Sequence, residues 1–204
     1  MVSRRQFIKN TGKASFALWL GATSNGFANA AFITDAPSNF TPFVKIEKNG
    51  KITIFNTKPE MGQGTFQSVP ALIAEELEVS LDAITIVQTS GEKQFGGGQA
   101  AGGSSSIRGN YDAYRKIGAA AKEMLIKAAS VKWGIGIESC YAENGSVHSK
   151  LSKEHLSYGD LIEEASKLEV PKEPKLKNKS DFKIIGKSIQ RPDVPLKVSG
   201  KAEY

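Results

Sequence analysis

Two glycine-rich segments hold the groups of this chain that are best suited to bind a ligand. The first is Glu60-Met61-Gly62-Gln63-Gly64, which follows an expected strand and precedes an expected helix. Gly62 and Gly64 let the backbone approach a flat or anionic ligand, and Gln63 offers both a hydrogen-bond donor and an acceptor. The amides at the start of a helix also attract phosphates. Taken alone, such a pattern is more often a tight strand-to-helix turn.

The second segment runs from Gly96 to Ser106 and leads into the longest expected helix. Its last five residues offer backbone amides and hydroxyl groups to a pyrophosphate; they are Gly102, Gly103, Ser104, Ser105 and Ser106. A flexible linker has a similar composition, but a linker rarely feeds into the longest helix of a domain. Two such loops flanking one strand–helix–strand unit face the same edge of a sheet, where α/β proteins bind ligands. The pair predicts a ligand site, with plain connections as the alternative.

Several other chemistries lack the residues that they need. No Gly-Lys-Ser/Thr follows the glycines and no Gly-x-Gly-x-x-Gly opens a first βα turn, so ATP and NAD are poor candidates. Cys140 is the single cysteine, which excludes an internal disulfide, a Cys-x-x-Cys zinc site and an iron–sulfur cluster built from this chain alone. His148 and His155 have no triad partners nearby and are expected at the surface. The sequence therefore offers no catalytic and no metal-ligating residue.

Alternating strands and helices must position the two segments. Asn49-Gly50 and Asn144-Gly145 each predict a tight hairpin turn. Helical spacing predicts a helix that starts near Ser68, with its glutamates at 75, 76 and 78 solvated and without a role. The other expected elements are strands over 43–46 and 52–57, a buried strand over 84–87, a long helix over 111–133 and a helix over 158–165 capped by Ser157. This pattern favours the α+β class, as a two-layer α/β sandwich.

The first thirty residues have the order of an export signal. Arg4 and Arg5 precede an apolar pair, and an uncharged, weakly hydrophobic run follows from Ala14 to Phe27. This run is too short to span a membrane. Ala28-Asn29-Ala30 provides small residues for a signal peptidase, which predicts cleavage after Ala30. The segment resembles a twin-arginine signal helix and predicts a periplasmic protein that is exported already folded.

The formal charge of +6 does not indicate a nucleic-acid partner. Four of the 27 basic residues lie in the first thirty positions, where there is no acidic residue. Without them, 23 basic residues face 21 acidic ones, and no stretch interleaves basic and aromatic side chains. We therefore expect no binding to nucleic acid.

Both glycine-rich segments and the tail together resemble a known enzyme family. In the tail, the spacing Arg191-x-Asp193-x-Pro195-x-Lys197-Val198-x-Gly200-x-Ala202-x-Tyr204 is similar to the start of an α/β hammerhead domain. The family is that of the molybdopterin-binding subunits of xanthine dehydrogenase and aldehyde oxidase type. Within it, the likeness is greatest to isoquinoline 1-oxidoreductase beta subunits and periplasmic aldehyde dehydrogenases.

The resemblance implies a cofactor, a reaction and partners. The cofactor is molybdenum-molybdopterin cytosine dinucleotide, with Gly62, Gln63 and Gly64 against the pterin and the 102–106 segment at the dinucleotide phosphates. The reaction inserts a water-derived oxygen into an N-heterocycle or an aldehyde. The partners are the remainder of the large subunit, a small [2Fe–2S] subunit that receives the electrons, and a cytochrome c as further acceptor.

This chain differs from the members of this family mainly in its length. Its members continue for several hundred residues, through the hammerhead domain to a glutamate that acts as base beside the metal, whereas this chain ends at Tyr204. We therefore expect an N-terminal part that is inactive on its own. It divides into a signal peptide (1–30), a molybdopterin-binding-like domain (40–170), a linker (171–181) and the start of a truncated hammerhead domain (182–204). The alternative is a non-catalytic periplasmic module that binds a ligand or a partner, ends near Ser166 and has a disordered tail.

Overall fold

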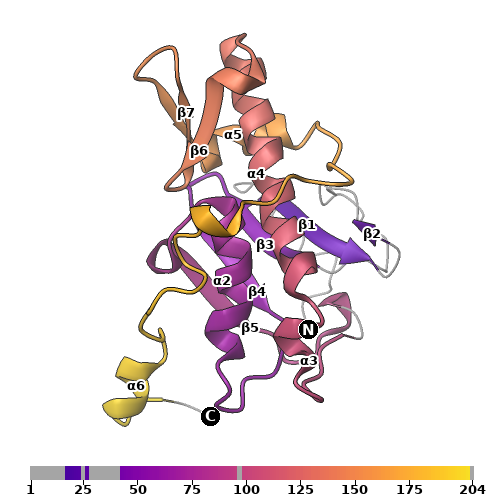
Figure 1. Ribbon diagram of the computed structural model, residues 1–204, viewed down its shortest axis with the longest axis vertical. Helices are drawn as coiled ribbons and strands as arrows, with labels where there is room; N and C mark the ends of the chain where they lie inside the picture. The colour runs from indigo at the N-terminus through magenta and orange to yellow at the C-terminus, as the bar shows by residue number, and fades with distance from the viewer. Residues whose placement is uncertain (1–16, 24–25, 28–41, 96–97, 203–204) are drawn as a thin grey trace, which may run out of the picture.

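A five-stranded mixed sheet and two long helices form the main body of the protein (Figure 1). The computed structural model describes residues 17–23, 26–27, 42–95 and 98–202. The strands are β1 (Ala17–Thr23), β2 (Gly26–Phe27), β3 (Pro42–Glu47), β4 (Ile52–Asn56), β5 (Ile84–Gln88), β6 (Cys140–Glu143), β7 (Ser146–Ser149) and β8 (His155–Ser157). The α-helices are α2 (Thr65–Leu77), α3 (Ser105–Arg108), α4 (Tyr111–Trp133), α5 (Tyr158–Ala165) and α6 (Val194–Val198).

The large sheet has the order β2-β1-β3-β4-β5 and contains the expected first hairpin. Asn49 and Gly50 turn the chain between β3 and β4, and Gly50 has a φ of 84°, in the left-handed region that favours glycine. Strand β4 then pairs in parallel with β5, with Ile54 opposite Ile86, and α2 makes the crossover between them. The carboxyl ends of β4 and β5 therefore lie at one edge of the sheet.

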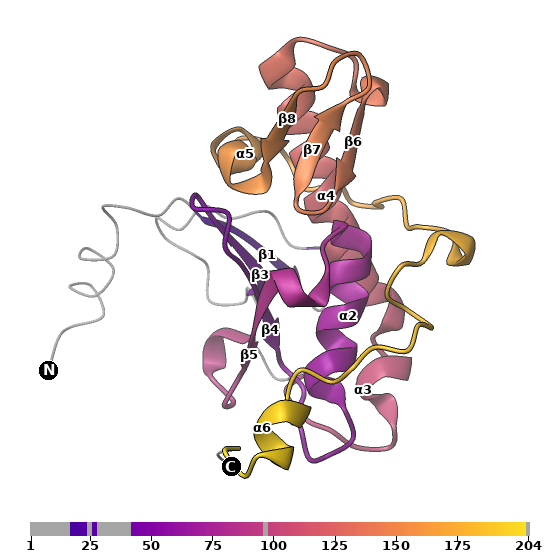
Figure 2. The ribbon, with the colours of Figure 1, turned by 90° about the vertical axis from the view of Figure 1, so that its left-hand side faces the viewer.

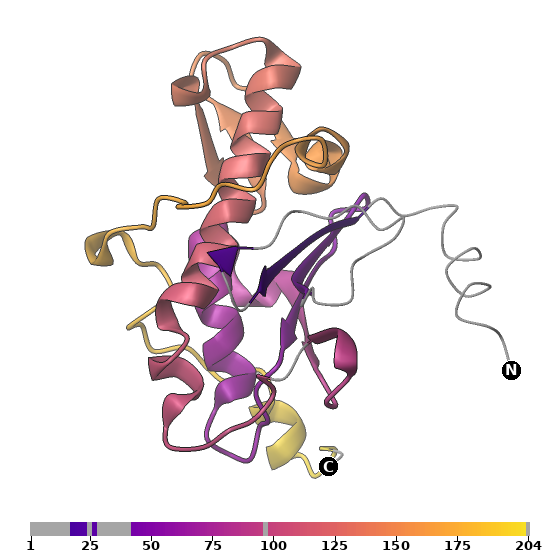
Figure 3. The same ribbon diagram turned by 90° about the vertical axis from the view of Figure 1, so that its right-hand side faces the viewer.

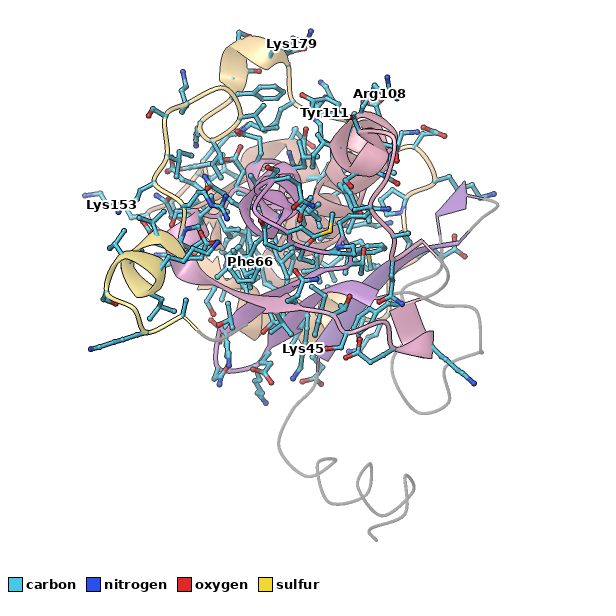
Figure 4. The ribbon with its side chains drawn as sticks, turned by 90° about the horizontal axis from the view of Figure 1, so that it is seen from below. Lys45, Phe66, Arg108, Tyr111, Lys153 and Lys179 are labelled. Atoms are coloured by element: carbon cyan, nitrogen blue, oxygen red, sulfur yellow. The ribbon has the colours of Figure 1, made fainter. Side chains whose placement is uncertain are left out.

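Helices α2 and α4 cover one face of this sheet (Figure 2). Seen from below, the helices lie on one side of the sheet and Lys45 of β3 on the other (Figure 4). Apolar side chains of β3, β4, α2 and α4 form the core between the layers. The two helices approach closely at Gly118, where an added Cβ would lie 2.2 Å from the carbonyl oxygen of Ile73. The expected α+β class, with helices packed on one face of a sheet, is confirmed.

A second, smaller sheet with the order β6-β7-β8 lies beside the C-terminal half of α4, together with α5 (Figure 3). Asn144 and Gly145, with φ of 48° and 75°, form the expected turn between β6 and β7. Ser157 caps α5 through a capping box with Asp160. The second hairpin, the long helix over 111–133 and the capped helix over 158–165 are thus confirmed.

Two elements differ from the sequence prediction. Helix α2 begins at Thr65, not near Ser68, because the left-handed Gly64 lets the helix start directly after the turn. Strand β5 is not fully buried: it is the edge strand of the sheet, and Val87 is 37% exposed. A run of β-branched residues does not reveal whether a further strand pairs with it.

The described part of the expected signal helix is a strand. Strand β1 pairs antiparallel with β3, with Leu20 opposite Val44. The prediction of a helix over these residues is wrong in this structure, because the outer edge of β3 offers unpaired amides and carbonyls that an extended segment satisfies. The twin-arginine pair and the predicted cleavage position after Ala30 lie outside the described residues.

Two glutamates that we expected to be solvated are buried. Glu75 is 1% exposed and Glu76 is fully buried. The Glu75 carboxylate accepts hydrogen bonds from the amides of Lys183, Ile184 and Ile185 and pairs with the Lys177 ammonium; the Glu76 carboxylate pairs with Arg115. The prediction failed because these partners lie 39 to 110 residues away in the sequence.

The segment after α5 is therefore docked on the domain over residues 177–185. Glu78, also expected to be solvated, pairs with Lys177 and Lys183 from this segment. Between 182 and 202 the chain contains the short helix α6 and no strand, so a hammerhead domain over 182–204 stays a prediction. Among the described residues, no helix has the length and apolar character that crossing a membrane requires.

Candidate functional site

A polar cleft of about 400 Å³ lies at the carboxyl ends of β4 and β5. Its volume falls in the range of about 300–1,000 Å³ that is usual for small-molecule sites. The residues that line it come from the ends of these two strands and from the chain that follows each of them: Thr57, Pro59, Glu60, Gln88, Thr89, Ser90, Gly91 and Gln99. Ligands of open α/β sheets bind at this edge.

Carboxamide side chains fix the walls of the cleft. Asn56 donates to the Gln88 side-chain oxygen at 2.8 Å, and the Gln88 amide donates to the carbonyl oxygens of Asn56 and Lys58 at 3.1 and 3.2 Å. The Gln99 side chain accepts from the Thr89 hydroxyl at 2.9 Å and donates to the Glu92 carbonyl. These bonds hold the two strand ends and the following loop in place before any ligand binds, which lowers the entropic cost of binding.

The first glycine-rich segment forms the Gly62 loop (residues 60–64), next to the cleft. Gly62 and Gly64 have φ of 101° and 91°, so both require glycine. The Gln63 side chain is folded onto its own turn: it donates to the Pro59 carbonyl and accepts from the Met61 amide. Gly62 and Gln63 are exposed and Gly64 is half-buried; none of the three lines the cleft, and Glu60 is the member of this loop that does.

Glu60 occupies the start of α2, where the sequence suggested room for a phosphate. Its carboxylate accepts from the amides of Gly62, Gly64 and Phe66 at 2.8–3.1 Å. Burial alone would raise the pKa of Glu60, but these amides and the Arg191 guanidinium outweigh burial and lower it. Arg191 also donates to the Gly62 carbonyl, so the tail holds this loop. A phosphate at this helix start would meet a carboxylate.

The second segment forms the Gly102 loop (residues 98–106). Gly103 and Ser104 have φ of 55° and 54°, and residues 102–105 are exposed. The Ser105 hydroxyl donates to the Gly102 carbonyl, and Arg108 donates to the Gly103 carbonyl. Helix α3, which begins in this loop, contacts α2, and Figure 1 shows α3 and the turn before α2 at the same end of the molecule. Both loops thus lie at one end of the molecule, although residues 102–106 do not line the cleft.

The residues that line the cleft were mostly missed by the sequence analysis. Thr57, Gln88 and Thr89 belong to no glycine motif, whereas Gln99 lies within the second glycine-rich segment but was not singled out. The signal that identifies the strand ends is positional: Asn56 and Gln88 are polar residues that directly end two β-branched runs, and parallel pairing places them side by side. A polar end to each of two neighbouring parallel strands would have predicted the site.

No catalytic constellation appears in the part of the chain that the structure describes. His, Cys, Asp and Glu side chains nowhere gather there in a group of three or more that could hold a metal. His148 and His155 stack with ring centroids 5.4 Å apart on neighbouring strands of the small sheet, and His155 is exposed, in agreement with a surface position. Cys140 is buried, which raises the pKa of its thiol.

Comparisons with known proteins identify the family of this chain. A family described as the molybdopterin cofactor-binding domain matches residues 4–196. The beta chain of isoquinoline 1-oxidoreductase from Brevundimonas diminuta is 24% identical, and one of the subunits of nicotinate dehydrogenase from Pseudomonas putida is 25% identical. These matches cover 100% and 99% of this chain but 31% and 17% of the relatives, so the chain spans about a third of their length or less.

Two further known proteins are also similar to this chain, again at low identity and over only part of their own length. A membrane-bound aldehyde dehydrogenase of Gluconacetobacter polyoxogenes is 26% identical over 100% of this chain and 27% of its own length. Among solved structures, quinoline 2-oxidoreductase from Pseudomonas putida 86 matches 78% of this chain and 21% of that chain, with 16% identity and a TM-score of 0.47. Because the family match spans most of the sequence and both glycine-rich loops lie within it, this chain belongs to the molybdopterin cofactor-binding domain family.

Proposed function

We propose that this chain holds the pterin of a molybdenum cofactor in the cleft at the carboxyl ends of β4 and β5, as one part of the large subunit of a molybdenum hydroxylase. The observation that carries the proposal is the preformed polar cleft beside the Gly62 loop. Its lining combines hydroxyls, carboxamides and backbone groups, and its one acid, Glu60, is already bonded to three amides. Such a lining fits a neutral heterocycle with both donor and acceptor edges, which a pterin is.

The charges near the two loops favour a different part of the cofactor at each of them. The Glu60 carboxylate at the start of α2 disfavours a phosphate at the Gly62 loop, which leaves Gly62, Gln63 and Gly64 for the uncharged pterin. The Gly102 loop instead presents exposed amides and hydroxyls, with Arg108 bonded to it. We assign the phosphates, in the cytosine dinucleotide form of the cofactor, to residues 102–106.

The reaction follows from the cofactor and the names of the relatives. When bound, a molybdenum cofactor of this type inserts a water-derived oxygen into a carbon of an N-heterocycle or an aldehyde. The relatives act on isoquinoline, nicotinate and aldehydes by their names, which supports this substrate class. Because the chain spans a third of their length or less, we propose that other parts of the large subunit supply the base and close the site. A small [2Fe–2S] subunit and a cytochrome c then receive the electrons.

The proposal is tested by replacing Gln63 with alanine in the complete large subunit, purified with its partners. Loss of this carboxamide is expected to weaken retention of the cofactor by about tenfold, the effect of one hydrogen bond. The measurement is molybdenum per protein after extensive dialysis, with circular dichroism to verify the fold. Gln190→Ala, which removes an exposed carboxamide from the tail, is the control and should retain wild-type molybdenum. Equal molybdenum in both variants would refute the assignment of the Gly62 loop.

We also propose export by the twin-arginine pathway and removal of the signal after Ala30. Changing Arg4 and Arg5 together to lysine is expected to keep the protein in the cytoplasm, because that pathway reads the arginine pair. The measurement is an immunoblot of the cytoplasmic and periplasmic fractions. Lys9→Arg serves as the control for a change of basic side chain in the same segment. Undiminished periplasmic protein in the double variant would contradict the proposal.

A further inference from the structure

Lys58 is a buried cation at the end of β4 for which the described residues provide no carboxylate partner. It is 8% exposed, and its ammonium donates to the carbonyl oxygen of Gly98 at 2.6 Å. Burial lowers the pKa of Lys58. The stem of Lys58 is buried and its ammonium lies beside the exposed Gly98 without a carboxylate, which is unusual because lysines are almost never buried unless paired.

Two other cations that are buried in the described part of the chain are arranged differently. Arg115 pairs with Glu76 at 2.7 Å, and Lys177 pairs with Glu75 and Glu78. Each of these two cations thus has a carboxylate beside it. Lys58 has none among the described residues, and its position beside the site suggests that something outside them provides the negative charge.

The surroundings of Lys58 specify the kind of charge. Its bonding partner, Gly98, opens the Gly102 loop, whose exposed amides and hydroxyls suit an oxyanion. An ammonium has three donors, and the described residues use one of them, at Gly98, so the others can serve an incoming anion. The other helix start at this end is filled by Glu60, which directs an anion away from α2 and toward the Gly102 loop.

We propose that Lys58 is the counter-charge for an anionic group of the phosphate class that binds at residues 98–106. The inference rests on the proposed function, since the cofactor phosphates are its natural ligand there, and it adds a residue that belongs to neither glycine motif. In the free protein the Lys58 ammonium holds the start of the loop through Gly98, and the bound anion provides the charge that the fold omits.

The probe is inorganic pyrophosphate, titrated calorimetrically into the full chain without cofactor. Lys58→Met is expected to weaken its binding by about ten- to a hundredfold, the effect of losing a hydrogen bond between charged groups. Lys58→Arg, which keeps the charge, is expected to retain most of the affinity. Lys153→Met, which removes an exposed lysine of the small-sheet end, is the control and should bind like the wild type.

Thermal unfolding without any anion gives a second, independent readout. Lys58→Met is expected to unfold at a higher temperature than the wild type, because it removes an unpaired buried charge and leaves the exposed Gly98 carbonyl to water. Pyrophosphate should then raise the unfolding temperature of the wild type and leave that of Lys58→Met unchanged. A variant that does not fold would itself overturn the proposal, since it would show that the ammonium is structural.

Two other outcomes would also overturn it: wild-type protein that does not bind pyrophosphate, or equal affinities for the wild type and Lys58→Met. Failure of the proposed function is distinguishable from both. If Gln63→Ala keeps its molybdenum while Lys58→Met loses pyrophosphate, the anion site stands and the pterin assignment falls. If instead Gln63→Ala loses its molybdenum while Lys58→Met still binds pyrophosphate, the pterin assignment stands and Lys58 does not belong to the anion site.

Discussion

Replacing Glu75 with glutamine is expected to lower the free energy of unfolding by about 3–5 kcal/mol, the usual cost of breaking a buried ion pair by changing one partner. The carboxylate is 1% exposed and accepts from three consecutive amides, those of residues 183–185, and from the Lys177 ammonium. Glutamine keeps one acceptor oxygen, but its amide hydrogens face backbone donors and Lys177 is left without that charge. Urea unfolding followed by circular dichroism measures the loss.

The pH dependence of the same variant identifies the carboxylate as the cause. Burial would raise the pKa of Glu75, but Lys177 and the three amides outweigh burial and lower it in the folded protein. Its contribution is therefore complete above the unfolded pKa of about 4.3 and is lost as the pH falls through the lower folded value. The difference between wild type and Glu75→Gln should shrink in that acid range. Glu163→Gln, an exposed change on α5, is the control, and a difference of equal size in both variants would contradict this account.

Replacing Gly118 with alanine is expected to destabilise the protein by about 1–3 kcal/mol or more, the usual cost of overpacking. The new Cβ would lie 2.2 Å from the Ile73 carbonyl oxygen and 3.0 Å from the Glu76 Cβ, so the backbones of α2 and α4 must separate. The sign of the change in stability identifies its cause, because alanine in place of glycine inside an exposed helix stabilises the protein by about 0.5–1 kcal/mol. Thermal unfolding measures the effect.

The control for this second change is Lys127→Ala, at an exposed position of the same helix, which should leave the unfolding temperature nearly unchanged. A Gly118→Ala protein as stable as the wild type would mean that the two helices do not pack as closely as described. Because α2 begins at the Gly62 loop, separation of the helices should also disturb the cleft.

The elements that the sequence predicted well are those whose signals are local. Asn-Gly turns require left-handed backbone, and both hairpins form at them. The capping box at Ser157 and the left-handed Gly134 lie within one turn of the helix ends that they define. These features depend on neighbours in the chain, so periodicity and turn chemistry suffice to find them.

What the sequence did not reveal depends on contacts across long separations. Glu75 and Glu76 fit the expected solvated face of α2 until residues 177–185 and Arg115 cover it. The edge position of β5 depends on which strands pair, and the strand at β1 on the free side of β3. Propensity and spacing describe a segment alone, whereas burial is decided by what packs against it.

In the candidate site, too, the sequence revealed the features with local signals and missed those that depend on long-range contacts. The sequence identified the glycine loops because positions with a positive φ favour glycine, and both loops lie at one end of the molecule. The sequence did not identify the cleft, because Thr57 and Gln88 become neighbours only through the parallel register of β4 and β5. The assignment of cofactor parts to residues 62–64 and 102–106 stays a prediction.

The tail contacts both ends of helix α2, which bears on hydrogen exchange in the tail and on ligand binding at the cleft. Its first turn is held by Glu60, which Arg191 of the tail contacts, and its last turn holds the tail amides of residues 183–185 through Glu75. Local opening of the tail therefore releases groups at both ends of one helix. A ligand that orders the Gly62 loop is therefore expected to slow hydrogen exchange of those distant amides, and by reciprocity docking of the tail is expected to strengthen binding at the cleft.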